Sequence, residues 1–149
     1  MIRLSRLADY GMILMTHIAS SPEPLHTAHA VAAATHVPEP TAAKILKALS
    51  RSELLDSHRG AGGGYELARS PHDITTAEII AALDGPIALT ECLDVHTGPC
   101  VLETFCPTRG HLYKINQAIH RALDDITLAD LASPFPLPPL ALAREVHDH

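Results

Sequence analysis

Residues 27–68 decide the fold, and they read TAHAVAAATHVPEPTAAKILKALSRSELLDSHRGAGGGYELA. Thr27 is a favoured helix N-cap residue and predicts a short helix over residues 28–34. Two prolines then stand at the start of a second helix, expected over about residues 38–53, where a missing N–H is tolerated. Two short helices joined by a tight turn are typical of a helix-turn-helix.

A glycine-rich hairpin is predicted directly after this motif. Two short strand-like runs within residues 54–68 flank a turn that contains four glycines, the first of them Gly60. Glycine supplies the positive φ that such turns require. A phosphate-binding loop is the alternative, but no Gly-Lys-Ser/Thr follows and no helix opens after the glycines. A hairpin behind a helix-turn-helix predicts a winged helix.

Further helices are predicted on both sides of this motif. Apolar residues at helical spacing predict a first helix over residues 5–20, and a later helix over residues 77–83 is capped by Thr75 or Thr76. A long amphipathic helix should run from about residue 108 to residue 126. Its apolar positions step by three or four residues, close to the seam of a coiled coil: Leu112, Ile115, Ile119, Ala122 and Ile126. Residues 127–131 should form a short closing turn.

The expected fold is therefore mainly α, with a winged helix-turn-helix DNA-binding domain and a long C-terminal dimerisation helix. The DNA-binding domain should occupy residues 1–85, and a cysteine-rich cluster-binding loop residues 86–107. The dimerisation helix should occupy residues 108–132, followed by a Pro-rich flexible tail over residues 133–149. Only 3% of the residues are aromatic, so the core should be aliphatic, which suits helices.

Charge is distributed unevenly along the chain, although the formal net charge is −6. The first 70 residues carry seven Lys or Arg and six Asp or Glu, whereas the remaining 79 carry four and eleven. Local basic surface matters more for phosphate contact than the total charge does. The acidic total therefore does not exclude a nucleic-acid partner.

Four residues are the candidates for contact with double-stranded operator DNA: Thr41, Lys44, Lys47 and Arg59. The first three share the more polar side of the helix expected over about residues 38–53. In a recognition helix, the N-terminal residues reach base edges and later cations reach phosphates. Arg59 lies at the base or tip of the hairpin, from which a long cation can enter a minor groove. The alternatives are an ordinary amphipathic helix and a solvated surface charge.

All three cysteines fall in one fifteen-residue window, at Cys92, Cys100 and Cys106. An odd count cannot form a closed disulfide framework. Structural zinc and redox relays favour closer pairs than these gaps of seven and five residues, whereas an iron–sulfur cluster accepts wider gaps. Cys106-Pro107 also matches the Cys-Pro ending of ferredoxin-type runs.

Two function classes have little support in the sequence. No Ser/His/Asp set, paired carboxylates or nucleotide motif stands out, so we expect neither an enzyme nor a small-molecule substrate. The N-terminus lacks the apolar core of a signal peptide, and no run of about eighteen apolar residues could span a membrane. We expect a cytoplasmic protein without a membrane partner, in which thiols stay reduced.

Several segments form a specific combination when they are taken together. They are LADY at 7–10, VP and KIL within 37–46, RGxGGGYxLA at 59–68, and the three-cysteine loop before the long helix. This combination resembles the Rrf2 family of winged-helix transcription regulators, with its IscR-like and NsrR-like members, over about residues 1–131. Residues 83–92, LDGPIALTEC, look most like its SUF-system regulators, which control an iron–sulfur assembly operon.

The resemblance implies a homodimer in which the long helices cross and each subunit binds one iron–sulfur cluster through the three cysteines. A [2Fe–2S] cluster is favoured, and [4Fe–4S] is the alternative. The family's histidine ligand corresponds to Arg109 here, which cannot ligate iron. Its acidic alternative, from the first helix of the partner subunit, corresponds to Asp9, and His111 is a second candidate for the fourth ligand.

The resemblance also bears on DNA recognition. Arg59 corresponds to the wing arginine that enters the minor groove. Ala43 replaces a glutamate that discriminates operators, so a different operator sequence is expected.

The expected function is a cluster-sensing repressor or dual regulator of SUF-type iron–sulfur assembly genes. A nitric-oxide or redox sensor of the same fold is the first alternative. An iron–sulfur or zinc carrier that does not bind DNA is the second, and a thiol-based redox enzyme is the third.

Overall fold

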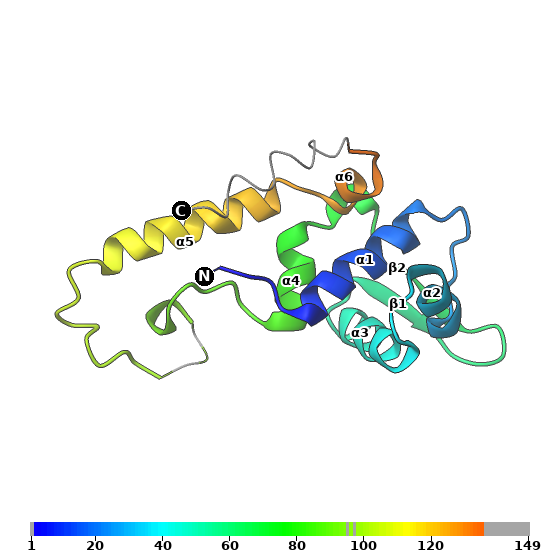
Figure 1. Cartoon of the computed structure of the whole chain (residues 1–149), viewed down its shortest axis with the longest axis horizontal. Coiled ribbons are helices and arrows are strands. Elements are labelled where there is room, and N and C mark those ends of the chain that lie inside the picture. Colours follow the sequence, from blue (N-terminus) through cyan, green and yellow to red (C-terminus); the bar gives the residue numbers. More distant parts are fainter. Residues whose placement is uncertain (1, 95, 97, 136–149) are drawn as a thin grey trace, which may run out of the picture.

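The computed structural model describes residues 2–94, 96 and 98–135. This part of the chain is mainly helical, with one small antiparallel sheet. No helix within it is long and apolar enough to cross a membrane. Figure 1 shows the first helices and the sheet gathered in one body, and a long helix that extends beyond it.

Three helices build the N-terminal half: α1 (Arg6–Ser20), α2 (Ala28–Thr35) and α3 (Glu39–Arg51). Thr27 caps α2, because its hydroxyl oxygen accepts the N–H of Ala30. His36 ends α2 in the left-handed conformation, with φ at 60°, and Pro38 occupies the N-cap position of α3. The predicted helix-turn-helix is confirmed, with its boundaries within about two residues.

The predicted hairpin is also present, as strands β1 (Leu55–His58) and β2 (Gly64–Leu67). They pair antiparallel, with Leu55 opposite Leu67 at one end and His58 opposite Gly64 at the other. A third segment joins this wing: the N–H of His26 donates to the carbonyl of Tyr65 at 2.8 Å, and the return bond measures 2.7 Å. The wing is therefore attached to the chain between α1 and α2.

Three helices follow the wing: α4 (Thr76–Asp84), α5 (Arg109–Asp124) and α6 (Leu128–Ala132). Thr75 caps α4 in a capping box, since its hydroxyl accepts the N–H of Glu78 while the Glu78 carboxylate accepts the N–H of Thr75. Two single turns of 3-10 helix complete the described elements, η1 (Pro71–Asp73) and η2 (Glu91–Leu93).

The core is aliphatic, as the sequence predicts, and it joins the helices to the first strand. Fully buried side chains come from α1, α2, α3, β1, α4 and α6 and from residues beside these elements, and they meet in a single cluster. The largest members are Leu14, Met15, Val31, Ile45, Leu46, Leu49, Leu54, Leu55, Ile74, Ile79 and Leu128.

The end of the described chain differs from the sequence prediction. A closing turn is expected after the long helix, but a helix, α6, occupies that place. Thr127 and Asp130 form a capping box at its start, and Leu128 is fully buried in the core. The N–H of Leu128 also donates to the carbonyl of Ile74 at 2.8 Å. This apolar anchor returns the chain to the body, so the segment is folded and not merely a turn.

The predicted seam of α5 divides between two faces. Leu112 and Ile119 are half-buried and belong to a face that turns toward the chain after α4, whereas Ile115 and Ala122 are exposed. Ile126 is also exposed, but α5 ends two residues before it, so the helix is slightly shorter than predicted. None of the residues of α5 is fully buried. The exposed apolar side chains on α5 and just after it are thus available to another chain. Of the predicted tail over residues 133–149, residues 136–149 lie outside the described part.

Candidate DNA interface and cysteine loop

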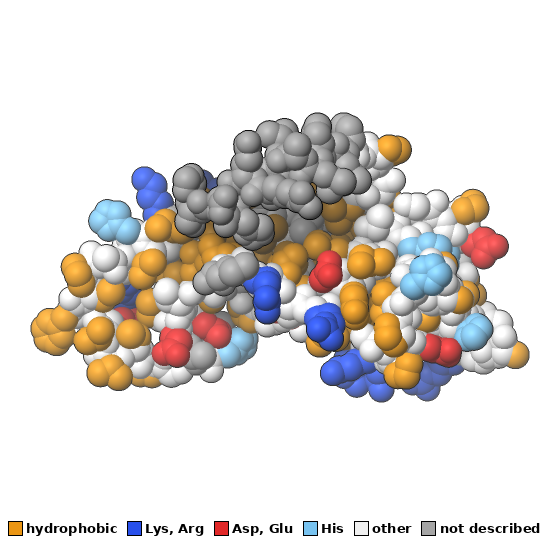
Figure 2. All heavy atoms as spheres, viewed as in Figure 1, with side chains coloured by type: hydrophobic (Ala, Val, Ile, Leu, Met, Phe, Trp, Pro, Cys, Tyr) orange, Lys and Arg blue, Asp and Glu red, His pale blue; other side chains and the backbone are white. Residues whose placement is uncertain are grey.

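One face of α3 is basic and open to solvent. Lys44, Lys47 and Arg51 are exposed, and Thr41 is half-buried at the start of the same row. Steps of three and four residues bring these side chains onto one face of a helix. The opposite face is apolar and fully buried, which fixes the rotation of α3 about its axis. Figure 2 shows Lys and Arg side chains gathered along the edge of the body where Figure 1 places α3.

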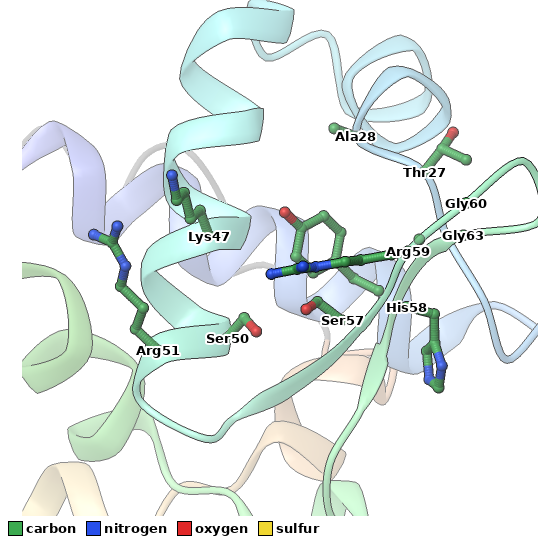
Figure 3. Close-up of a pocket in the computed structure, with 12 residues that line it drawn as sticks. Thr27, Ala28, Lys47, Ser50, Arg51, Ser57, His58, Arg59, Gly60 and Gly63 are labelled. Carbon is green, nitrogen blue, oxygen red and sulfur yellow. The ribbon is translucent and has the colours of Figure 1, made fainter.

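A groove of about 610 Å³ separates α3 from the wing. Lys47, Ser50 and Arg51 line it from α3, and Ser57 and the residues after it line it from the hairpin. Figure 3 shows the side chain of Arg59 reaching from the end of β1 toward α3, on which Lys47 and Arg51 lie. Two arginines and one lysine therefore line one concave surface.

These cations are not neutralised by neighbouring carboxylates. Lys44, Lys47, Arg51 and Arg59 form no salt bridge with any residue in the described part of the chain. An unpaired cationic groove of this kind suits a polyanion, because each cation that reaches a phosphate releases a counterion.

The structure refines the position of Arg59 and adds Arg51 to the candidates. Arg59 is the first residue after β1, so it begins the loop at the tip of the hairpin, next to the last strand pair of His58 and Gly64. Arg51 was not among the residues predicted to contact DNA, although it follows Lys47 by four residues and this spacing could have identified it. Its place in the groove depends on how the wing folds back beside α3.

The cysteine loop presents three free thiols, all half-buried. Cys92 lies in η2, with its sulfur 3.2 Å from the hydroxyl of Thr90. Cys100 begins a turn in which its carbonyl accepts the N–H of Glu103. Cys106 lies three residues before α5, with its sulfur 3.4 Å from the hydroxyl of Thr108.

The environment of Cys106 favours the thiolate. Hydrogen bonds from the side chain and backbone of Thr108 lower the pKa of the Cys106 thiol, and the backbone and charge of Arg109 act in the same direction. The thiolate is the form that binds metals. Arg109, at the family's histidine position, forms an ion pair with Glu103 at 2.6 Å.

The three thiols are not gathered around a common point. Within the described residues, no three His, Cys, Asp or Glu side chains lie close enough together to hold a metal ion. Asp9 is exposed near the start of α1, and His111 is exposed in the first turn of α5. The donor set fits an iron–sulfur cluster in its chemistry, since three free thiols share one loop. Gathering them requires the loop to rearrange.

Apolar side chains on the same loop are unusually exposed. Val101 is 96% exposed and Phe105 is 86% exposed. Figure 2 shows hydrophobic atoms at the end of the molecule where Figure 1 places this loop. Burial of such side chains is favourable, and here they remain in solvent. This arrangement of the loop is therefore not held by packing against the body.

Comparison with known proteins identifies the family. The family described as "Rrf2: Iron-dependent Transcriptional regulator" matches residues 4–134. The regulator CymR of Bacillus subtilis is 32% identical over 134 residues, which cover 89% of this chain and 91% of CymR. The regulator NsrR of Halalkalibacterium halodurans is 27% identical over 131 residues, which cover 87% and 90% of the two chains.

Solved structures agree with this assignment. The structure of CymR, described as the global cysteine regulator of B. subtilis, superimposes with a TM-score of 0.72 and 32% identity, covering 91% of this chain and all of that one. IscR of T. potens superimposes with a TM-score of 0.64 and 28% identity, covering 99% and 93%. These relatives are transcriptional regulators and not enzymes. On these grounds, the chain belongs to the Rrf2 family of transcriptional regulators.

Proposed function

We propose that this protein is a homodimeric, cytoplasmic DNA-binding regulator that represses transcription and senses an iron–sulfur cluster. The observation that carries the DNA-binding part is the unpaired basic groove between α3 and the wing, lined by Lys47, Arg51 and Arg59. The three free thiols of the loop before α5 support the sensing part.

Operator recognition follows from the position of α3. Its N-terminal turn, with Thr41, enters the major groove and meets base edges, and Lys44 and Lys47 contact the flanking phosphates. The guanidinium of Arg59 turns from the protein groove into the adjacent minor groove, where narrow A·T-rich stretches concentrate negative potential. Arg51 adds a phosphate contact at the C-terminal end of α3.

Dimerisation uses exposed apolar side chains on α5 and just after it. Ile115 is 49% exposed and Ile126, two residues beyond the helix, is 44% exposed, and with Ala122 they form an apolar row. A second copy of α5 that crosses this row buries it. A two-fold dimer presents two copies of α3, so the operator is a palindrome with half-sites about one helical turn or slightly more apart.

The cluster is held by Cys92, Cys100 and Cys106, with a fourth ligand from outside this set. Asp9 of the partner subunit is the first candidate and His111 the second. When bound, the cluster supplies a redox-active and exchangeable group whose presence changes the arrangement of the loop. A carboxylate is a harder ligand than a thiolate and leaves one iron more exchangeable, as sensing requires.

The regulated genes are proposed to be those of SUF-type iron–sulfur assembly, on the resemblance of residues 83–92. A nitric-oxide or redox sensor of the same fold is the second candidate, because proteins named NsrR are among the relatives. Exposure of the cluster-loaded protein to nitric oxide distinguishes these two candidates. Release of DNA at equimolar nitric oxide, with DNA affinity that does not respond to the supply of cluster, favours the nitric-oxide sensor.

A gel shift with anaerobically purified protein tests the proposal. Genomic fragments selected by the protein are titrated at several salt concentrations, and iron and acid-labile sulfide are measured in parallel. We expect specific binding with a steep salt dependence and equal amounts of iron and sulfide. Stoichiometric zinc without sulfide contradicts cluster sensing, and the absence of any specific fragment supports a carrier that does not bind DNA.

A further inference from the structure

Asn116 of α5 clamps the chain that leads to Cys92. Its side-chain amide donates to the carbonyl of Ile87 at 3.0 Å, and its side-chain oxygen accepts the N–H of Leu89 at 3.0 Å. One amide thus satisfies the backbone on both sides of Ala88, as a neighbouring strand would do. Both polar atoms of the side chain are used.

This asparagine lies on an otherwise apolar face. Leu112 precedes Asn116 by four residues, and Ile119 and Leu123 follow it by three and seven; all four side chains are half-buried. Ile119 and Leu123 also line an apolar groove of about 450 Å³ with the chain after α4. A polar group on such a face is costly unless it is hydrogen-bonded, so it favours one register of the two segments over any slipped one.

The clamp makes α5 a common support for two of the three cysteines. Cys106 precedes the first residue of α5 by three residues. Cys92 follows the clamped Leu89 by the same number, a span of at most about 11 Å of extended chain. Asn116 lies seven residues into α5 from Arg109, which is about 10 Å along the helix axis. The clamp therefore limits how far Cys92 can move from Cys106.

We propose that Asn116 is a positioning residue that holds Cys92 in register with Cys106 along α5. Its role for the cluster rests on the proposed function, but its effect on Cys92 does not. The clamp keeps Cys92 and Cys106 on the same support, so that gathering the three thiols requires Cys100 to move rather than the whole loop.

The test replaces Asn116 with leucine, which removes both hydrogen bonds and keeps the branched shape of the side chain. Because leucine has the higher helix propensity, a change in the loop would not come from a weakened α5. Gln117→Leu is the matched control, because the amide of Gln117 donates to the hydroxyl of Tyr113 on the exposed side of the same helix. Amide hydrogen exchange at Leu89 is measured in the protein without cluster. The loss of two hydrogen bonds is expected to speed this exchange by about tenfold or more, and the control should leave it unchanged.

A second readout follows Cys92 itself. In a Cys100→Ser, Cys106→Ser background, the rate of maleimide alkylation of Cys92 is expected to rise several-fold on Asn116→Leu and to stay constant on Gln117→Leu. With all three cysteines present, the reconstituted cluster should also lose iron to a chelator several times faster. Faster exchange at Leu89 with unchanged alkylation of Cys92 overturns the proposal.

The two readouts separate this inference from the proposed function. If wild-type protein takes up no cluster but alkylation responds as expected, the positioning role stands and the cluster proposal fails. If Asn116→Leu proves unfolded by circular dichroism, Asn116→Asp replaces it, since the carboxylate can still accept from Leu89 but cannot donate to Ile87. An unchanged rate of Cys92 alkylation in Asn116→Asp also overturns the proposal.

Discussion

Substitution of Gly64 by alanine should detach the wing from the segment before α2. A Cβ at this position would lie 2.6 Å from the carbonyl oxygen of His26 and 2.9 Å from its carbonyl carbon. Real Cβ atoms do not approach other atoms within 3.0 Å, and the obstacle here is backbone, which cannot rotate away. One of the two segments must therefore shift away from the other at this contact.

The loss of stability can be worked out from the interactions between these two segments. Two backbone hydrogen bonds join His26 and Tyr65, at 2.7 and 2.8 Å, and each contributes about 1 kcal/mol to stability. His26 is only 5% exposed, so part of its buried surface also returns to water. We expect the free energy of unfolding to fall by about 2–3 kcal/mol, with the hydrogen bonds as the larger part. In urea, this corresponds to a midpoint lower by about 1 M or more.

Urea unfolding followed by circular dichroism measures this change at equal protein concentrations. Gly62→Ala is the control, since a Cβ at Gly62 meets nothing within 4 Å. Operator affinity should also fall for Gly64→Ala, because Gly64 and Arg59 line the same groove. A Gly64→Ala protein with the wild-type midpoint, or a Gly62→Ala protein with an equal loss, would show that close packing of the wing is not what requires glycine here.

Four other substitutions test the DNA contact of the wing, the fourth cluster ligand and the cap of α6. Arg59→Ala should weaken operator binding by about 1–3 kcal/mol in a gel shift, and unchanged affinity would exclude a minor-groove contact. Asp9→Ala should alter the absorption spectrum of the cluster and reduce the difference in DNA affinity between holo and apo forms, whereas His111→Ala should do neither; the reverse result assigns the fourth ligand to His111. Hydrogen bonds from Thr127 lower the pKa of the Asp130 carboxyl in the folded protein. The stability that these bonds confer is therefore present above the ordinary pKa of about 3.8, and it is lost as the pH falls through the lower pKa of the folded state. The urea midpoint of Asp130→Asn should therefore lie below that of the wild type near neutral pH and converge with it in acid, and a difference that persists in acid would refute this assignment.

Short-range features of the chain could be predicted from sequence because their causes are local. Thr27 caps the helix that follows it through a hydrogen bond to the residue three positions later. The left-handed His36 and the prolines at the start of α3 act within one turn of chain. The hairpin depends on glycines next to one another in sequence. In each case the interacting groups are a few residues apart, so the pattern of residue types contains the information.

Other features depend on which distant segments meet, and they could not be predicted in this way. The heptad-like row on α5 identifies an apolar helix, but the division of Leu112 and Ile119 from Ile115 depends on where the chain after α4 passes. His26 is one of eleven histidines in the sequence, and nothing local distinguishes it from the others. It joins the wing only through its pairing with Tyr65.

The helix-turn-helix, the wing and the three thiols on one loop can be predicted from the sequence, because caps, turn residues and spacing act between near neighbours. The groove shared by Arg51 and Arg59, and the hydrogen bonds of Asn116 to the chain before Cys92, depend on tertiary packing. Asn116 and Ile87 are 29 residues apart, and their bond exists because the body returns the chain to the side of α5. Such contacts arise from the packing of whole elements, and no local pattern of residues encodes them.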